Sequence, residues 1–269
     1  MAYIEIIKEN GDELLKDTDC LFYLKTSWGL ELASNSLNSK QSKFLSVKLL
    51  HFCQPLQSIT GCENFEFAKM NIDCSLLKGK HVYLNILSPG DIEELRILAK
   101  DDRIWEFTKT LLIDEKYDQM FDEYISLALD NKALEGQVAF VIRNLKDRSI
   151  IGMSRYYGID EKNRRLNIGY TWYIPSVWGA VYNKECKLLL LDYAFDKLSL
   201  NRVGFEVAHQ NIRSQKAVAK IGGVKEGVLR KYALRPDGIS RDTFVFSIIN
   251  DEWPETKKRL EQLITSSEK

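Results

Sequence analysis

The most constraining feature of this chain is the order of patterns between Arg165 and Thr243. A strand, a loop, a leucine-rich helix, a second strand and a helix that begins Asn-x-x-Ser follow one another there. The first strand, residues 166–174, alternates in part and stops at Pro175, which has no backbone N–H to donate to a sheet. This order predicts a sheet with helices packed against it.

The loop of residues 176–183 leads into a helix predicted over residues 184–198, and Asn183 is placed to cap that helix. One face of the helix carries Leu188, Leu191, Phe195 and Leu198. The first turn of a helix presents backbone N–H groups without partners at the positive end of the helix dipole. The loop and helix together therefore predict a site for an anion such as a pyrophosphate.

The rest of the chain beyond residue 80 alternates in the same way. Val82, Leu84 and Ile86 predict a strand, and residues 88–91 (Ser-Pro-Gly-Asp) predict a helix start. The further predictions are a helix to about Lys100; a helix over 116–130 with Met120, Tyr124, Leu127 and Ala128 on one stripe; strands over 138–143, 150–157, 165–173, 202–207, 226–234 and 241–249; and helices over 212–221 and 255–263. The fold class is α/β, a mixed sheet with helices on both faces.

Several short segments between Ile168 and Pro254 carry a resemblance when taken in order. They are residues 168–172, 178–179, 187–195, 201–203, 211–214, 226–230, 236–238, 241–243 and 252–254. With these segments the chain resembles the GCN5-related N-acetyltransferases (GNAT), and within them the branch of the ribosomal-protein N-terminal (serine/alanine) acetyltransferases. The resemblance covers about Leu76 to Leu263.

The resemblance implies acetyl-CoA as co-substrate and no metal. It implies that the backbone of Trp172, Tyr173 and Ile174 binds the pantetheine arm, and that Trp178, Gly179, Ala180, Val181, Tyr182 and Asn183 form the phosphate loop. Asn211 would also hold the pantetheine, and Ser214 would protonate the departing thiolate. Helix capping is the alternative interpretation of the Asn-x-x-Ser motif, and core packing is the alternative for the Trp172 side chain.

The chain departs from the family in its phosphate loop and in its base. Val181 stands where the family has a glycine, and a β-branched residue resists positive φ, which predicts a differently bent loop or weaker coenzyme A binding. Close relatives carry a glutamate on the strand after the Asn-x-x-Ser helix, where this chain has Tyr232 and Ala233. Tyr232 is the predicted proton shuttle. Glu226, His209 and Asp242 are alternatives that would act through water.

The acceptor is predicted to be a primary amine. Trp105 and Glu106 match a place where the family builds its acceptor pocket, and Tyr170 is expected beside them. Glu106 would receive a cationic amine, although a solvated helix face also explains it. A protein N-terminal amine is suggested by the resemblance, and a polyamine, an antibiotic or another small amine is the alternative.

The composition narrows the class of protein. The chain of 269 residues is 45% hydrophobic and 28% charged, which is typical of a soluble globular protein. Lys+Arg and Asp+Glu balance at 38 each, which disfavours nucleic acid and anionic membranes as partners. Five cysteines without a C-x-x-C pair and three scattered histidines predict neither a disulfide framework nor a metal site. The absence of a leader-like or membrane-spanning segment predicts a cytoplasmic protein.

Residues 1–75 differ in character from the rest, and hold four of the five cysteines. They are predicted to form an extension of unassigned fold, in which residues 3–7 and 44–52 are strands or short helices, ahead of an acetyltransferase domain over 76–264. The predicted function is acetyl-CoA-dependent N-acetylation. The competing hypothesis is a catalytically idle domain of the same fold that binds acyl-CoA or a partner protein. A homodimer is one expectation for the oligomeric state.

Overall fold

The computed structural model of the chain describes residues 22–26, 29–33, 72, 76–108, 110, 115–130, 136–235 and 237–267. The chain divides into two compact units, Met1–Glu66 and Phe67–Lys269. In the first unit, β1 (Phe22–Thr26) and β2 (Gly29–Ala33) pair in antiparallel fashion. The elements predicted over 3–7 and 44–52 lie outside the described residues, and the domain boundary near residue 75 stays a prediction.

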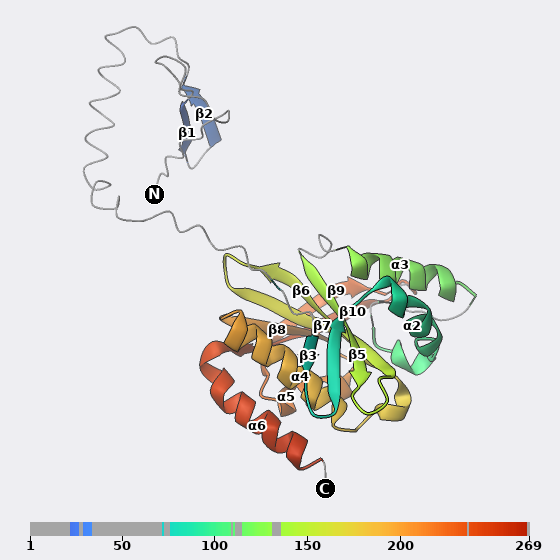
Figure 1. Ribbon diagram of the computed structural model, residues 1–269. Coiled ribbons are helices and arrows are strands. Elements are labelled where there is room, and N and C mark those ends of the chain that lie inside the picture. The colour runs from blue at the N-terminus through green and yellow to red at the C-terminus, as the bar shows by residue number, and fades with distance from the viewer. Residues whose placement is uncertain are drawn as a thin grey trace, which may run out of the picture. The chain divides into compact units, whose positions relative to one another are not determined.

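The second unit is built on one eight-stranded sheet (Figure 1). Its strands are β3 (Leu76–Lys78), β4 (Val82–Ile86), β5 (Gln137–Asn144), β6 (Ile150–Asp160), β7 (Arg165–Tyr173), β8 (Arg202–Ala208), β9 (Val224–Leu234) and β10 (Ser240–Ile249), in the order β3-β4-β5-β6-β7-β8-β10-β9. Every neighbouring pair is antiparallel except β7 and β8, which are parallel. The predicted mixed sheet is therefore confirmed.

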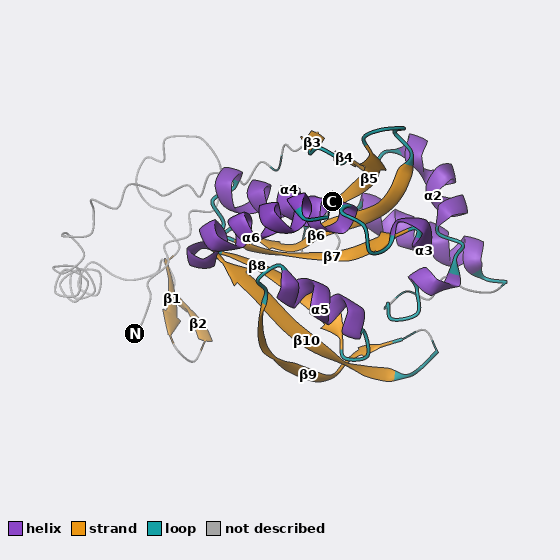
Figure 2. Cartoon of the chain, turned by 90° about the horizontal axis from the view of Figure 1, so that it is seen from below, coloured by secondary structure: helices purple, strands orange, loops and turns teal. Residues whose placement is uncertain are grey.

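Helices cover both faces of this sheet (Figure 2). They are α2 (Ile92–Leu98), α3 (Tyr117–Leu129), α4 (Tyr182–Asp192), α5 (Ile212–Lys220) and α6 (Trp253–Thr265). Short 3₁₀ turns at Pro89–Asp91, Asp102–Ile104, Pro175–Val177 and Asn250–Glu252 join several of them. None of the helices in the described ranges combines the length and the apolar character that crossing a bilayer requires.

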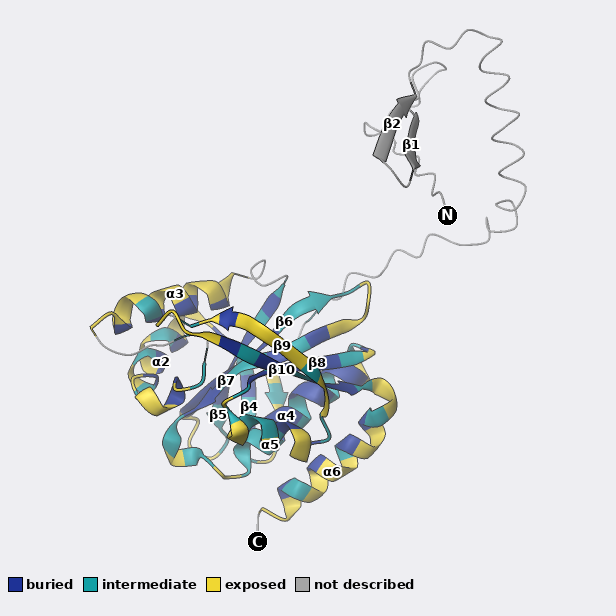
Figure 3. Ribbon diagram, turned by 180° about the vertical axis from the view of Figure 1, so that it is seen from behind, coloured by how far each residue is buried: buried dark blue, intermediate teal, exposed yellow. Residues whose placement is uncertain are grey.

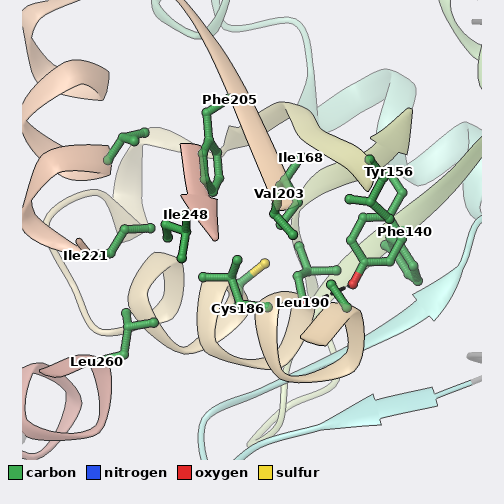
Figure 4. Close-up of a cluster of buried hydrophobic side chains, with 14 of the residues drawn as sticks. Phe140, Tyr156, Ile168, Cys186, Leu190, Val203, Phe205, Ile221, Ile248 and Leu260 are labelled. Atoms are coloured by element: carbon green, nitrogen blue, oxygen red, sulfur yellow. Dashed lines mark hydrogen bonds between the residues drawn. The ribbon is translucent and has the colours of Figure 1, made fainter. Parts of the chain in front are cut away.

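The core has two parts because successive strand residues point to opposite faces. On β5, Phe140 and Ile142 join a cluster with side chains of α4, α5 and α6, whereas Ala139 and Val141 join a cluster with α2 and α3. Figure 4 shows the first cluster, in which Cys186 and Leu190 of α4 face strand residues such as Phe205 and Ile248. The sheet is thus buried on both faces.

The predicted stripe of the leucine-rich helix is only partly right. Leu191 and Phe195 are buried, but Leu188 and Leu198 are only half-buried, and Cys186, Leu190 and Ala194 are as fully buried as Leu191. Figure 4 shows Cys186 and Leu190 on the side of the helix that faces the sheet. Four consecutive leucines give no period from which to choose a face. The helix also ends in a π-helical turn over Tyr193–Lys197, which shifts the later residues around its axis.

The predicted stripe of the helix over 116–130 is also shifted. Tyr124 and Ala128 are buried as expected, but Phe121 and Ile125 occupy the inner positions assigned to Met120 and Leu127, and Leu127 is 37% exposed. The prediction for Leu127 was wrong. The buried face includes the aromatic rings at the start of the helix, and their burial sets its orientation.

The position of the site follows from a break in the sheet between β7 and β8. These strands pair only at Arg165–Arg202, Leu166–Val203 and Asn167–Gly204. Beyond the last pair the two strands separate. Where they part, Gly204 leaves room for a side chain: a Cβ there would lie 2.2 Å from Asn167 Oδ1. The separated ends leave an opening in the middle of the sheet.

Candidate active site

A cavity of about 500 Å³ occupies the opening between β7 and β8. Its walls are parts of the segment 104–110, residues 168–173 of β7, residues 177–180, the first turns of α4, residues 205–208 of β8, and α5. The facing edges of β7 and β8 make no ladder hydrogen bonds with each other there. An extended ligand can therefore pair with strand backbone inside the cavity.

A β-bulge shapes the β7 wall. Tyr170 and Thr171 together oppose Ser154 of β6, and Tyr170 has a φ of 50°, in the left-handed region. The Thr171 hydroxyl lies 2.8 Å from that of Ser154. Bulges of this kind re-aim side chains and backbone next to active sites. Here the bulge directly precedes Trp172 and Tyr173, whose backbone was predicted to bind the pantetheine arm.

The start of α5 brings the Asn-x-x-Ser motif to the cavity. Asn211 is the N-cap, and its Oδ1 accepts a hydrogen bond from the backbone N–H of Ser214 at 2.9 Å. Both residues line the cavity. The asparagine oxygen therefore caps the helix, as the alternative interpretation of the motif expected, while the amide nitrogen and the serine hydroxyl are left for other roles.

The phosphate loop differs from its prediction in its backbone. Asn183 is not the cap of α4: it lies inside the first turn, and Val181 takes the cap position. Val181 has an ordinary helical φ of −66°, so the strain predicted for a β-branched residue does not arise. The positive φ of the loop falls at Gly179, at 80°. Trp178, Gly179, Ala180 and Asn183 line the cavity, whereas Val181 and Tyr182 do not.

Three basic side chains line the same end of the cavity, namely Lys184 of α4 and Arg213 and Lys220 of α5. The Arg213 guanidinium lies 4.1 Å from the centre of the Trp178 ring. Burial, and then repulsion from Lys220, lowers the pKa of Lys184. A cluster of mutually repelling cations at a helix start is suited to an anionic ligand.

A fourth cation, Lys187, lies deeper in the cavity. Its side chain comes from α4 and is almost fully buried, and Nζ donates to the Thr171 hydroxyl at 2.9 Å. Burial lowers the pKa of Lys187 to about 8. The sequence predicted only apolar contacts for this face of the helix.

Aromatic rings form another wall of the cavity. The Trp105 ring packs edge-on against Tyr124 at 5.5 Å and lies 5.9 Å from Trp172. Trp172 Nε1 donates to the Tyr124 hydroxyl at 3.2 Å. The side chain of Trp172 therefore packs in the core, which was the alternative interpretation for it. Of the residues predicted for the acceptor pocket, Trp105 and Tyr170 line the cavity, whereas Glu106 is exposed and lies outside the lining.

Glu206 of β8 was missed by the sequence analysis. It is the one carboxylate among the described residues that line the cavity. The predicted shuttle Tyr232 is 51% exposed on β9 and does not line the cavity, but its hydroxyl donates to Glu206 Oε1 at 3.4 Å. The signal was a charged residue between the buried positions Phe205 and Val207, five residues before Asn211.

The other residues considered as bases lie outside the cavity lining, as does Ile174. Glu226 forms an ion pair with Arg202, which lowers the Glu226 pKa, and accepts a hydrogen bond from the Ser247 hydroxyl. Asp242 accepts the backbone N–H of Lys231, and His209 Nδ1 lies 3.3 Å from the Asp242 carbonyl. These side chains are engaged in the structure of the sheet edge.

Comparisons with known proteins agree with this architecture. The family model described as "Acetyltransferase (GNAT) domain" matches residues 81–224. The chain is 35% identical over 102 residues to "Uncharacterized N-acetyltransferase YoaA" of Bacillus subtilis, covering 38% of this chain and 56% of that relative, so little more than half of YoaA is matched. It is 32% identical over 126 residues to "Uncharacterized N-acetyltransferase p20" of Bacillus licheniformis, covering 46% of this chain and 70% of that relative. It is 27% identical over 181 residues to "Putative ribosomal N-acetyltransferase YdaF" of Bacillus subtilis (65% and 94%).

Solved structures share the fold. A putative acetyltransferase from T. thermophilus superposes with a TM-score of 0.63 at 30% identity, over 71% of this chain and 97% of that one. Mycobacterium smegmatis RimJ in complex with CoA-disulfide has a TM-score of 0.57 at 23% identity, over 68% of this chain and 88% of that one. A spermidine N-acetyltransferase from Vibrio cholerae has a TM-score of 0.53 at 21% identity, over 64% of this chain and 98% of that one. These last two likenesses show the fold alone. Because the family model covers just over half of the chain, the chain belongs to the GNAT acetyltransferase family.

Proposed function

We propose that this protein transfers an acetyl group from acetyl-CoA to a primary amine in the cavity between β7 and β8. One observation carries the proposal. The two strands separate after Asn167 and Gly204, and the space between them is lined both by Glu206 and by the Asn-x-x-Ser start of α5. A proton acceptor and a proton donor thus face a channel of strand backbone, which is what aminolysis of a thioester requires.

Coenzyme A would enter along the basic end of the cavity. Its pyrophosphate would bind the loop of residues 178–183 at the start of α4, with Lys184, Arg213 and Lys220 supplying positive charge. The pantetheine arm would lie along the unpaired edge of β7 and bind the backbone of Trp172 and Tyr173 and the side-chain amide of Asn211, but not Ile174, whose backbone N–H donates to the Ile151 carbonyl. The donor set consists of backbone N–H groups and cations, which fits a phosphorylated, amide-containing ligand.

The chemistry needs two protons removed from the ammonium group, one before and one after the attack, and one proton supplied to the departing sulfur. Glu206 would accept a proton from the ammonium group of the acceptor, and the neutral amine would attack the thioester carbonyl carbon. Backbone N–H groups of β7 would stabilise the oxyanion of the tetrahedral intermediate. As the intermediate collapses, the C–S bond breaks, the Ser214 hydroxyl would protonate the thiolate, and the serine oxygen would regain a proton from the cationic nitrogen of the intermediate. Tyr232, which donates to Glu206, would connect the carboxylate to solvent.

The acceptor we propose is the N-terminal amine of a protein. The similarity to the putative ribosomal N-acetyltransferase YdaF supports this class. The charge of the cavity disfavours a polyamine, because the lining carries two further cations that are not assigned to the phosphates, Lys187 and Arg241, and the single carboxylate Glu206. A polycation would be repelled from such a surface.

The test is acetyl-CoA binding by calorimetry, followed by thiol release with and without amines. We expect binding by the wild type and release that requires an N-terminal peptide. Ser214→Ala and Glu206→Gln should retain binding and lose turnover, whereas Glu255→Gln, an exposed carboxylate at the start of α6, should retain both. Binding without release in the presence of any amine would contradict the proposal and favour the catalytically idle alternative.

A further inference from the structure

A buried guanidinium lies in the cavity wall without an acidic partner. Arg241, near the start of β10, lines the cavity and is 5% exposed. Its Nη1 donates to the Phe107 carbonyl at 2.7 Å, and its Nε has no hydrogen-bond partner. No ion pair forms between Arg241 and any carboxylate in the described part of the chain. A guanidinium has five N–H donors, so much of its hydrogen-bonding capacity is unused.

An unpaired buried charge is costly, so its retention calls for an explanation. Charged side chains are almost never fully buried unless paired, because burial removes the water that solvates them. Burial, and then repulsion from Arg235, lowers the pKa of Arg241, and the influence of Glu206 and Tyr157 offsets this only in part. An anionic ligand in the cavity would supply both the missing charge and the missing acceptors.

The position of Arg241 assigns it to the acceptor rather than to coenzyme A. Its bond to Phe107 places it beside the segment 104–110, and the electrostatic influence of Glu206 and Tyr157 reaches it. Tyr157 lines the cavity and packs edge-on against Tyr170 at 5.4 Å. The cations suited to the phosphates come instead from α4 and α5. Arg241 therefore lies on the side where the base and the aromatic wall meet.

We propose that Arg241 binds a carboxylate of the acceptor, so that the preferred acceptor is a primary amine with a carboxylate close to it. This inference rests on the proposed function and narrows its substrate class. A guanidinium matches a carboxylate through two parallel N–H···O bonds, which fixes orientation as well as charge. The acceptor is then held at two points: its amine at Glu206 and its carboxylate at Arg241. A free amino acid and a peptide whose first residue is acidic both satisfy this chemistry.

The test compares acceptors that differ only in charge. One arm uses glutamate against its α-amide isoglutamine and its side-chain amide glutamine, and the other uses the tripeptide amides Glu-Ala-Ala and Gln-Ala-Ala, each with acetyl-CoA. We expect kcat/KM of the wild type to favour the carboxylate roughly 10- to 100-fold in at least one arm, the size expected for hydrogen bonds to a charged group. The arm that discriminates identifies the source of the carboxylate. Equal rates in both arms would overturn the inference without any variant.

Arg241 itself is tested by Arg241→Met, which keeps much of the length of the side chain and removes its donors. In Arg241→Met the values of kcat/KM for the acid and the amide acceptor should become nearly equal. The control Arg230→Met changes an exposed arginine on β9 and should leave the wild-type preference for the carboxylate unchanged. A role limited to holding Phe107 would slow all acceptors alike, so an unchanged ratio in Arg241→Met overturns the inference. Calorimetric binding of N-acetylglutamate against N-acetylglutamine amide, which lacks both carboxylates, to the wild type with coenzyme A is independent of turnover. A carboxylate preference there supports the inference even if no amine is acetylated, and equal binding overturns it.

Discussion

At the scale of single residues, the buried ammonium of Lys187 is the feature with the clearest consequence for stability. Its folded pKa of about 8 lies below the ordinary 10.5 because burial disfavours the charged form. Below pH 8 the Lys187 amine is protonated in both the folded and the unfolded chain, so the folded state bears the full free-energy cost of burying the charge. Between pH 8 and 10.5 the folded state releases the proton first, so the cost disappears as the pH rises.

Lys187→Met should therefore stabilise the fold. At pH 7 we expect the free energy of unfolding to rise by up to ~3 kcal/mol, the value of the pKa difference. Urea denaturation of wild type and variant at pH 7, 8.5 and 10 checks this, because the gap should narrow with increasing pH. Lys216→Met, on the exposed face of α5, is the control and should change little at any pH. A gap that stays constant with pH would show that Lys187 is not buried as a cation.

Some residues of the candidate site could be predicted from the sequence, and others could not. Asn211 and Ser214 were found because a four-residue motif specifies both a cap and a site. Glu206 was missed because the base was sought after the Asn-x-x-Ser helix, on the strand of Tyr232. Only the sheet order β8-β10-β9 brings Tyr232 and Glu206 within hydrogen-bond distance. That proximity comes from tertiary pairing and has no local signature in the sequence.

At the scale of elements, the start of α5 combines a structural and a proposed binding role in Asn211, and the two can be separated. Its side-chain oxygen caps the helix, while its amide nitrogen is proposed to bind the pantetheine arm. Asn211→Ala removes both and should cost about 1 kcal/mol of stability. Asn211→Ser keeps an oxygen that can cap but lacks the amide.

We expect Asn211→Ser to unfold at nearly the wild-type urea concentration and yet to bind acetyl-CoA more weakly, as Asn211→Ala does. Urea denaturation and calorimetry of the three proteins measure the two effects. Wild-type affinity in Asn211→Ser would mean that Asn211 acts as a cap alone.

Elements were predicted well where periodicity was clear and poorly where it was not. The bounds of β4 and β7 match their predictions because alternation and a following turn or proline specify them. The predictions of which residues of α3 and α4 face inward were wrong or only partly right, because apolar residues occur all around both helices. Which of them faces inward is decided by the sheet on which they pack, and this depends on distant strands.

At the scale of the whole molecule, every residue of the proposed site lies within one of the two compact units. The cavity lining runs from Ile104 to Leu263, inside Phe67–Lys269. The shorter fragment 67–269 should therefore bind acetyl-CoA and turn over an amine within about twofold of the full chain, since no lining group is removed. Calorimetry and thiol release on both proteins test this. A loss of binding in a fragment that remains folded by circular dichroism would assign residues 1–66 a part in the site.

The whole sheet also explains why the exposed strand β9 matters to the site. It lies at an edge, and most of its side chains are exposed (Figure 3). Tyr232 nevertheless reaches Glu206 from this strand. In the proposed mechanism, solvent would exchange protons with Glu206 through Tyr232 of β9, while the acyl donor would approach from α4 and α5.

In the proposed mechanism, Glu206 of β8 removes a proton from the amine of the acceptor. The most direct test is a single-turnover measurement with saturating acetyl-CoA and an N-terminal peptide, for wild type and Glu206→Gln, from pH 6 to 10. At pH 7 we expect the single-turnover rate of Glu206→Gln to be about 10²- to 10⁴-fold lower than that of the wild type, with unchanged affinity for acetyl-CoA. The difference should shrink at high pH, where the amine arrives already neutral. Equal rates at pH 7 would contradict the account.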